Sequence, residues 1–231
     1  MRALWSLRAA TREQRRRRLR RPAFFGTLRR TLPLSDRWGE DRGTAVDRYY
    51  VEQFLEQHRD DLRGRVLEVA DTRYTARFGR DVTVSDILDV DAANTNATVV
   101  ADLGVPDSLP ENAYDCFVLT QTLQYVYDVH AAIRSVRATL ATGGVVLATV
   151  PAVTRIARSA GVDGDYWRFT AAACDRLFRE AFDDVAVESH GNVLVATAFL
   201  QGVAREELSQ EELDFVDPFF PVLVTVRAVK R

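Results

Sequence analysis

Short apolar runs recur along the chain, and polar or turn-forming segments separate them. The first run contains Val66, Leu67 and Val69, and most of the others are equally rich in Val, Ile and Leu. Runs of this kind are typical of strands that are buried on both faces of a parallel sheet. The pattern predicts seven strands, at residues 66–69, 82–87, 98–101, 115–119, 145–150, 185–187 and 222–229.

Amphipathic segments lie between several of these strands. Residues 44–60 carry apolar side chains at helical spacing, and Thr44 followed by Asp47 resembles a capping box. Asp128 and Thr170 are expected to cap the helices that follow them. Strands that alternate with helices predict an α/β fold with a doubly wound, mostly parallel sheet. Two further helical segments are predicted, at residues 192–204 and 209–214.

Acidic residues follow the first two predicted strands. Glu68 and Asp71 stand at the end of the first strand, and Asp86 lies near the end of the second. In open α/β sheets, ligands bind outside the carboxyl ends of the strands. We therefore expect these acids, with Thr72, to lie at one edge of the sheet, in the layout of a nucleotide-binding half.

Four stretches, in this order, resemble motifs of class I S-adenosylmethionine-dependent methyltransferases. They are Glu68-Val69-Ala70-Asp71 followed by Asp86, the fourth-strand run at 115–120, LATGGVVL at 140–147, and WRFT at 167–170. The resemblance spans about residues 40–229. It implies a Rossmann-like, doubly wound sheet of seven strands that is mostly parallel, with an antiparallel C-terminal strand.

The first motif departs from the family pattern. The family usually has E-x-G-x-G-x-G, whereas Ala70, Thr72 and Tyr74 stand at the glycine positions of this chain. Glycine lets the backbone take positive φ values and approach a ligand closely. Ala70 adds one methyl group, and Tyr74 must point away from the ligand.

The resemblance implies a role for each matching residue. Glu68, Ala70 and Asp71 would form the turn against the methionine part of the cofactor, S-adenosyl-L-methionine. Asp86 would accept hydrogen bonds from the ribose hydroxyls, for which a charged acceptor is stronger than a neutral one. Asp102 would lie beside the adenine. Two residues after the fourth strand would line the cleft, Thr120 and Gln121.

The long loop before WRFT contains the residues expected to contact the methyl acceptor. Tyr166, Trp167 and Arg168 are interpreted as a substrate wall, and Trp38 and Tyr49 as parts of a lid. An oxygen acceptor must also lose its proton to a nearby base. The sequence does not single out that base, so the catalytic residue stays open among His130, Asp128, His190 and Asp165.

Composition and charge restrict the setting. The 231 residues, 47% hydrophobic and 28% charged, are enough for one sizeable core. We expect an Arg-rich extension at 1–32 and a methyltransferase-like domain at 33–231.

No apolar run is long enough to span a bilayer, and the N-terminus lacks the features of a secretory signal. Cys116 and Cys174 fall in apolar patterns, which favours buried thiols in a cytoplasmic protein. The three histidines have no metal-ligand spacing, so no metal is expected.

The net charge of −2 hides an asymmetry. Residues 1–30 hold eleven arginines and one acid, which leaves 20 bases and 32 acids in the rest of the chain. Such an arm is suited to an acidic partner or an anionic surface, or is simply solvated. Few aromatic residues are interleaved with the arginines, so nucleic acid is disfavoured as the partner.

Two functional hypotheses follow. The first is an S-adenosylmethionine-dependent methyltransferase that acts at oxygen on a small molecule or glycan, because the run at 41–50 resembles a subgroup found with sugar-modifying enzymes. The alternative is a non-catalytic relative with a weakened cofactor site that serves as a binding or regulatory module. A nicotinamide-dependent oxidoreductase is disfavoured because G-x-G-x-x-G is absent from the first turn.

Overall fold

The computed structural model of the chain describes residues 26–231. The chain divides into two units, residues 1–33 and 34–231, and each is treated by itself. The described part of the first unit contains one short 3₁₀ helix, Gly26–Leu28. Most of the expected Arg-rich extension lies outside the described residues, so its boundaries and role stay predictions.

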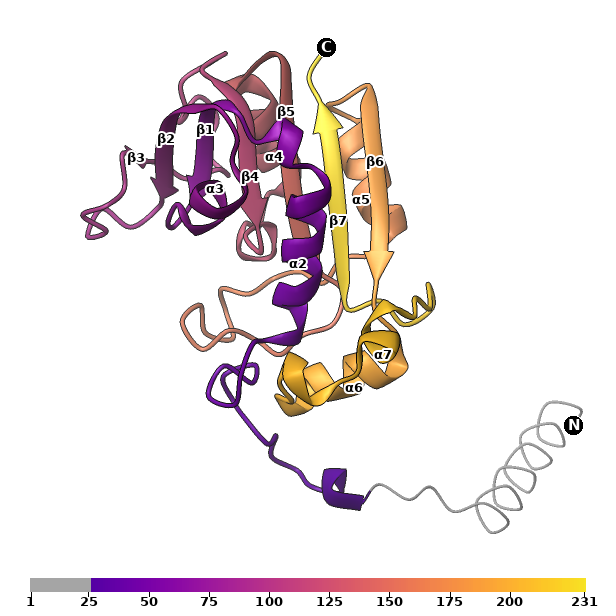
Figure 1. Cartoon of the computed structure of the whole chain (residues 1–231). Coiled ribbons are helices and arrows are strands. Elements are labelled where there is room, and N and C mark those ends of the chain that lie inside the picture. Colours follow the sequence, from indigo (N-terminus) through magenta and orange to yellow (C-terminus); the bar gives the residue numbers. More distant parts are fainter. Residues whose placement is uncertain (1–25) are drawn as a thin grey trace, which may run out of the picture. The chain divides into compact units, whose positions relative to one another are not determined.

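The second unit is built on one seven-stranded sheet with the order β3-β2-β1-β4-β5-β7-β6 (Figure 1). β1, β2, β3, β4 and β5 pair in parallel, and β7 runs antiparallel to both β5 and β6. The predicted mostly parallel, doubly wound sheet with an antiparallel last strand is therefore confirmed. The strands are β1 (Gly64–Val69), β2 (Val82–Asp89), β3 (Val99–Val100), β4 (Tyr114–Thr120), β5 (Leu140–Pro151), β6 (Asp184–His190) and β7 (Leu223–Val229).

Helices cover both faces of the sheet, as Figure 1 shows for α2 in front and for α4 and α5 behind. Side chains on successive strand residues point to opposite faces. Leu67, Phe117 and Val146 are aligned across β1, β4 and β5 and belong to the core under α4 and α5. Their neighbours Val66 and Cys116 belong to the core under α2. The helices are α2 (Val46–Gln57), α3 (Arg73–Phe78), α4 (Val129–Thr139), α5 (Ala171–Arg179), α6 (Val193–Gln201) and α7 (Gln210–Asp214).

Local capping explains where several helices begin. The Asp128 side chain accepts from the backbone N–H of Ala131 at the start of α4, and Thr170 accepts from Ala173 at the start of α5. Both predicted caps are confirmed. The expected capping box of α2 is wrong, because Thr44 instead donates from its backbone N–H and its hydroxyl to Glu206, at 2.9 and 2.7 Å. The first turn of α2 therefore lacks a side-chain cap.

Both cysteines are buried and unpaired, as expected. Of the helices within residues 26–231, none is both long and apolar enough to cross a membrane.

Candidate functional site

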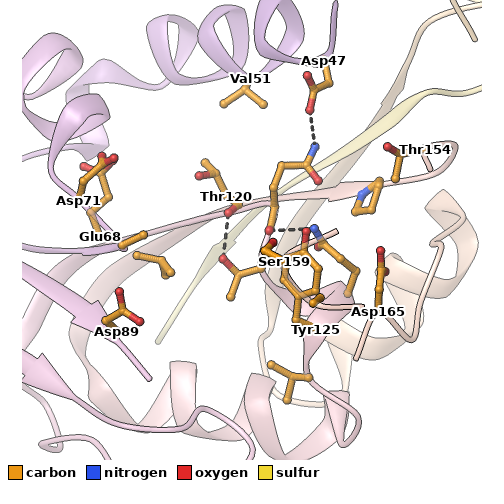
Figure 2. A pocket seen from close by; sticks show the side chains of 18 of the residues that line it. Asp47, Val51, Glu68, Asp71, Asp89, Thr120, Tyr125, Thr154, Ser159 and Asp165 are labelled. Atoms are coloured by element: carbon orange, nitrogen blue, oxygen red, sulfur yellow. Dashed lines mark hydrogen bonds between the residues drawn. The ribbon is translucent and has the colours of Figure 1, made fainter. Parts of the chain in front are cut away.

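A cleft of about 960 Å³ lies at the carboxyl ends of the parallel strands. Its walls come from the turns after β1, β2, β3 and β4, from the first turn of α2 and from the loop at 151–165. In the view of Figure 2, Glu68, Asp71 and Asp89 lie toward one end, and Thr154 and Asp165 toward the other. Thr120 lies between the two ends in that view.

Glu68 organises the turn after β1. Its side chain is buried, and its two carboxylate oxygens accept from the backbone N–H groups of Tyr74 and Thr75, at 3.0 and 2.8 Å. These bonds satisfy two amides in the first turn of α3, which would otherwise lack partners. Burial raises the pKa of Glu68 despite the hydrogen bonds it accepts. The ring of Tyr74 stacks on Phe78, whose side chain packs into the core under α2.

Ala70 has a left-handed backbone conformation, which favours glycine. Its φ is 70°, in the left-handed region, although the residue carries a Cβ. Its N–H donates to the carbonyl of Leu88 at 2.9 Å, so the turn after β1 is tied to the end of β2. Because Ala70 has a Cβ, its left-handed conformation costs about 1–2 kcal/mol of stability.

Asp71 faces the cleft beside an arginine. Its carboxylate accepts from the backbone N–H and from the guanidinium of Arg73. Burial acts to raise the pKa of Asp71, but the hydrogen bonds from Arg73 outweigh it, and the net shift is downward. Asp71 is therefore ionised, and the Arg73 cation partly neutralises this wall of the cleft.

The acid at the end of β2 is Asp89, not Asp86. β2 continues three residues past Asp86, which pairs opposite Leu67 in the middle of the strand. Asp86 accepts hydrogen bonds from Thr98 Oγ1 at 2.8 Å and from the Tyr114 hydroxyl at 3.1 Å, and it does not line the cleft. The expectation that Asp86 stands at the strand's carboxyl end is wrong.

Asp89 occupies the carboxyl end of β2 and was not predicted as a site residue. Its carboxylate accepts from the backbone N–H of Asp91 at 2.9 Å and from Asn94 Nδ2 at 2.7 Å. The hydrogen bond from Asp91 is the main cause that lowers the pKa of Asp89. The site therefore holds an ionised, fixed carboxylate. The available signal was the apolar pair Ile87-Leu88, which extends the strand to the next acid.

The other expected cofactor residues reach the cleft. Asp102 lines it from the turn after β3, where its carboxylate accepts from the N–H of Gly104 at 2.8 Å. Thr120 and Gln121 line it at the end of β4. Gln121 has a φ of 47°, and its N–H donates to the carbonyl of Thr149 at 2.9 Å. The turn after β4 is thus fixed to β5.

Two polar groups near this turn were not expected. Asp47, from the first turn of α2, accepts from Gln121 Nε2 at 3.3 Å, a contact drawn in Figure 2. Burial raises the pKa of Asp47 to about 6. Gln124 is buried and lines the cleft, and its Nε2 donates to the carbonyl of Gln121 at 2.8 Å. Its carbonyl oxygen Oε1 is buried without a hydrogen-bond partner within residues 26–231.

Arg168, expected in the substrate wall, is absent from the lining of the cleft. Its guanidinium pairs with Asp165 and donates to the carbonyls of Thr154 and Arg155, at 3.3 and 3.0 Å. Arg168 therefore holds the loop together from behind, and Asp165 is the member of the pair that lines the cleft. Burial acts to raise the pKa of Asp165, but the bonds from Arg168 outweigh it and lower the pKa.

Tyr166 and Trp167 also lie outside the lining. Both side chains are exposed, and Tyr127 contacts both rings, with centroids 5.4 Å from Tyr166 and 6.2 Å from Trp167. Trp167 Nε1 donates to the carbonyl of Val126 at 3.1 Å. The structure thus groups these aromatics on the surface, beside the loop that carries Tyr125 of the cleft.

One of the two expected lid residues lines the cleft. Trp38 Nε1 donates to Thr154 Oγ1 at 3.0 Å, and the Arg155 guanidinium lies 3.5 Å from the Trp38 ring. These contacts join the loop before α2 to the loop after β5. Tyr49 lies elsewhere, and its hydroxyl donates to Asp214 at 2.5 Å.

Neither histidine candidate for the base lines the cleft. His130 forms an exposed 2.8 Å pair with Glu180. His190 stacks on Tyr50 and bonds Thr225 Oγ1 at 2.9 Å, and burial lowers its pKa. Asp128 is occupied as the cap of α4. Within residues 26–231, no group of three His, Cys, Asp or Glu side chains is arranged to hold a metal ion.

The sheet order and the cleft over β1, β2 and β4 define a Rossmann-like protein of the class I methyltransferase type. Comparison with protein families agrees. The model of the "Methyltransferase domain" family matches residues 42–195, which is more than half of the chain. The chain belongs to this family and is a class I S-adenosylmethionine-dependent methyltransferase.

Solved structures share the fold. An S-adenosylmethionine-dependent methyltransferase from Mesorhizobium loti is 19% identical, with a TM-score of 0.52 over 80% of this chain and 98% of that one. The cyclase SpnF is 17% identical, with a TM-score of 0.52 over 82% and 84%. Phosphoethanolamine N-methyltransferase 2 from Haemonchus contortus is 14% identical, with a TM-score of 0.51 over 77% and 52%. A comparison with curated protein sequences gave no match.

The residues present fit S-adenosyl-L-methionine, the cofactor of the family. The cleft volume lies within the roughly 300–1,000 Å³ that is typical of small-molecule sites. The turn at Ala70 keeps its left-handed backbone, and Asp89 supplies an ionised acceptor at the end of β2. Glu68 holds the turn from beneath through the amides of Tyr74 and Thr75.

Proposed function

We propose that the protein transfers the methyl group of S-adenosyl-L-methionine to an oxygen of a small molecule or glycan. The observation that carries this proposal is a pair of hydrogen-bond acceptors that line the cleft, one from α2 and one from the turn after β4. Asp47 offers a carboxylate, and Gln124 has a buried carbonyl oxygen without a partner in the described residues. Such an oxygen costs about 1–3 kcal/mol, which a hydroxyl donor of a ligand would recover.

The cofactor end of the site is proposed at the turns after β1, β2 and β3. Glu68, Ala70 and Asp71 would face the methionine part. Asp89, in place of Asp86, would accept from the ribose hydroxyls, and Asp102 would lie beside the adenine. Their positions around one cleft support this assignment.

The chemistry requires little of the protein beyond placement. The bound cofactor supplies an electrophilic methyl group on a sulfonium. The residues of the chain hold the acceptor in line with that methyl group, exclude water and accept the proton of the hydroxyl. Thr120 and Gln121 sit where the two ends of the cleft meet and would line the path of transfer. Trp38 and Arg155 would close the cleft over the acceptor.

The alternatives are nitrogen methylation and a non-catalytic role. A carboxylate beside the acceptor also suits an amine, and one solved neighbour is an N-methyltransferase by name. The absence of the glycines favours the non-catalytic role, whereas the left-handed backbone of Ala70 favours cofactor binding.

Thermal unfolding with S-adenosylmethionine, S-adenosylhomocysteine and NAD tests the cofactor first. A ligand at a hundredfold its Kd stabilises by about 2.7 kcal/mol, or roughly 5–10 °C in Tm for a domain of this size. Label transfer from methyl-labelled cofactor to methyl glycosides, catechols and primary amines then separates oxygen from nitrogen acceptors. The proposal fails if folded protein shows no shift with either adenosyl ligand, or if only the amines become labelled.

We also propose a compartment for the protein and a partner for its N-terminal extension. The buried thiols of Cys116 and Cys174 support a reducing compartment such as the cytoplasm. The arginines within residues 1–30 support an acidic partner or an anionic surface for the N-terminal extension.

A further inference from the structure

The first turn of α2 faces two different strand ends. Arg48 lines the cleft, and its charge acts on Asp71 and Tyr74 in and after the turn that follows β1. Asp47, the preceding residue, bonds Gln121 after β4. Figure 2 shows Asp47 reaching from α2 into the region between the acidic end and the loop end of the cleft. This turn therefore carries one cation toward the proposed cofactor end and one carboxylate toward the acceptor.

Few side chains bind or act electrostatically on the Asp47 carboxylate. Within residues 26–231, Gln121 is the only side chain that hydrogen-bonds its carboxylate. Two charged groups act on it, Arg48 on its own helix and Glu40 in the preceding loop, and these two form a 3.4 Å ion pair with each other. Burial raises the pKa of the Tyr74 hydroxyl in α3, and the charge of Asp47 acts on it in the same direction. Burial dominates and raises the pKa of Asp47 to about 6, where a carboxylate is a better base than one in water.

Gln121 gives Asp47 a fixed position. Its backbone is held in the left-handed region, with its N–H bonded to the carbonyl of Thr149 and its carbonyl bonded to Gln124 Nε2. The side chain that reaches Asp47 thus starts from a turn anchored on both sides. A base must be held within hydrogen-bond reach of the proton it removes, and this anchoring supplies the necessary rigidity.

We infer that Asp47 faces the transferred methyl group from the acceptor side and takes the proton of the acceptor, with Gln121 as its positioning residue. This inference rests on the proposed function. The acceptor oxygen forms the new bond to the methyl carbon, and the electron pair of the broken carbon–sulfur bond stays on sulfur. The hydroxyl proton passes to the Asp47 carboxylate and from there to solvent.

The decisive experiment uses the charge difference between two ligands. S-adenosylmethionine carries a sulfonium cation, and S-adenosylhomocysteine has a neutral sulfur at the same place. A cation within roughly 8 Å at an effective dielectric constant of about 20 lowers a carboxyl pKa by about one unit or more. Carboxyl ¹³C NMR of aspartate-labelled protein, assigned with Asp47→Asn, should show Asp47 titrating about one unit lower with the methionine form. Asp214, which accepts from the Tyr49 hydroxyl and does not line the cleft, should titrate equally with both.

The affinities of the two ligands give a second test, because the ionisation of Asp47 and the binding of the sulfonium are thermodynamically linked. If the sulfonium lowers the pKa of Asp47, the carboxylate must in turn favour the sulfonium ligand by the same factor. Asp47→Asn should weaken S-adenosylmethionine about tenfold and leave S-adenosylhomocysteine within twofold. Glu52→Gln removes a carboxylate from the same helix at its exposed pair with Arg77 and should change neither affinity.

The outcomes separate the inference from the function on which it rests. Binding of both ligands with an unchanged Asp47 titration and an unchanged affinity ratio would overturn the placement of Asp47. Failure of folded protein to bind either ligand would overturn the proposed function instead, and the inference with it. With the acceptor found by label transfer, Asp47→Asn should lower kcat at least a hundredfold and remove the acid limb of its pH profile, which in the cofactor complex lies below the value of about 6 for the free protein. Retention of that limb would contradict the proton transfer.

Discussion

The guanidinium of Arg168 holds the carboxylate of Asp165 with two nitrogens, at 2.5 and 3.0 Å, beneath the loop that forms one wall of the cleft. The Asp165 side chain is only 2% exposed, so its charge depends on this pair. Removing one partner of such a pair leaves an uncompensated buried charge. The loop at 151–168 owes its position to this contact as well as to its backbone.

We expect Arg168→Gln to lower the free energy of unfolding by about 2–4 kcal/mol, or roughly 10 °C in Tm. Arg168→Lys keeps the charge but not the two parallel N–H donors of the guanidinium, and it should recover about half of the lost free energy of unfolding. Arg176→Gln, at an exposed position of α5, is the control and should change Tm by no more than about 1 °C. Equal Tm values for the two glutamine variants would contradict the structural role of Arg168.

Ala70→Gly should stabilise the protein, although most exchanges of alanine for glycine destabilise. The left-handed φ of 70° costs alanine about 1–2 kcal/mol, and the added freedom of glycine in the unfolded chain costs about 0.4–1 kcal/mol. The net gain is about 0.5–1 kcal/mol, measurable by denaturant unfolding. Ala76→Gly in α3 is the matched control and should destabilise by about 1 kcal/mol. Two losses of similar size would be inconsistent with the turn described for Ala70.

Asp89→Asn should weaken S-adenosylmethionine about 10- to 100-fold, because hydrogen bonds to a charged acceptor are worth about 1.5–3 kcal/mol. Asp86→Asn should leave the affinity within twofold, since Asp86 bonds Thr98 and Tyr114 inside the sheet. Isothermal titration calorimetry on both variants makes the comparison. A larger loss for Asp86→Asn than for Asp89→Asn would return the ribose contact to Asp86.

The fold was predictable because its evidence is local and repeated. Each buried strand is an apolar run, and the caps at Asp128 and Thr170 depend on bonds within three residues. Glu68 was predictable for a related reason, since an acid inside an apolar run must be satisfied nearby, and the amide of Tyr74 that satisfies it lies six residues later. Contacts between residues three to six positions apart leave a pattern in the sequence that can be recognised.

The misplaced site residues depend on contacts between distant segments. At the end of β2, Leu88 and Asp89 pair with Val99 and Val100, and this pairing adds to the weak local signal of Ile87-Leu88. The capping box at Thr44 and Asp47 is lost because Thr44 bonds Glu206, 162 residues away. Arg168 is the exception, since its partner Asp165 stands only three residues before it and the ion pair involves no distant segment.

The pH dependence of stability should carry the signature of Asp47. Its pKa is about 6 in the folded protein and about 3.9 in the unfolded chain, so folding disfavours the charged form. The resulting penalty is fully present above pH 7, fades as pH falls from about 6 to 4, and is absent below that. Asp47→Asn should therefore raise the free energy of unfolding by about 2 kcal/mol at pH 8 and by almost nothing at pH 4. Urea unfolding at these two pH values tests the sign, and Glu52→Gln, on the same helix, should show no such difference. A variant that is less stable than the parent at pH 8 would mean that Asp47 is a stabilising structural acid, not a carboxylate held at a cost for the chemistry of the cleft.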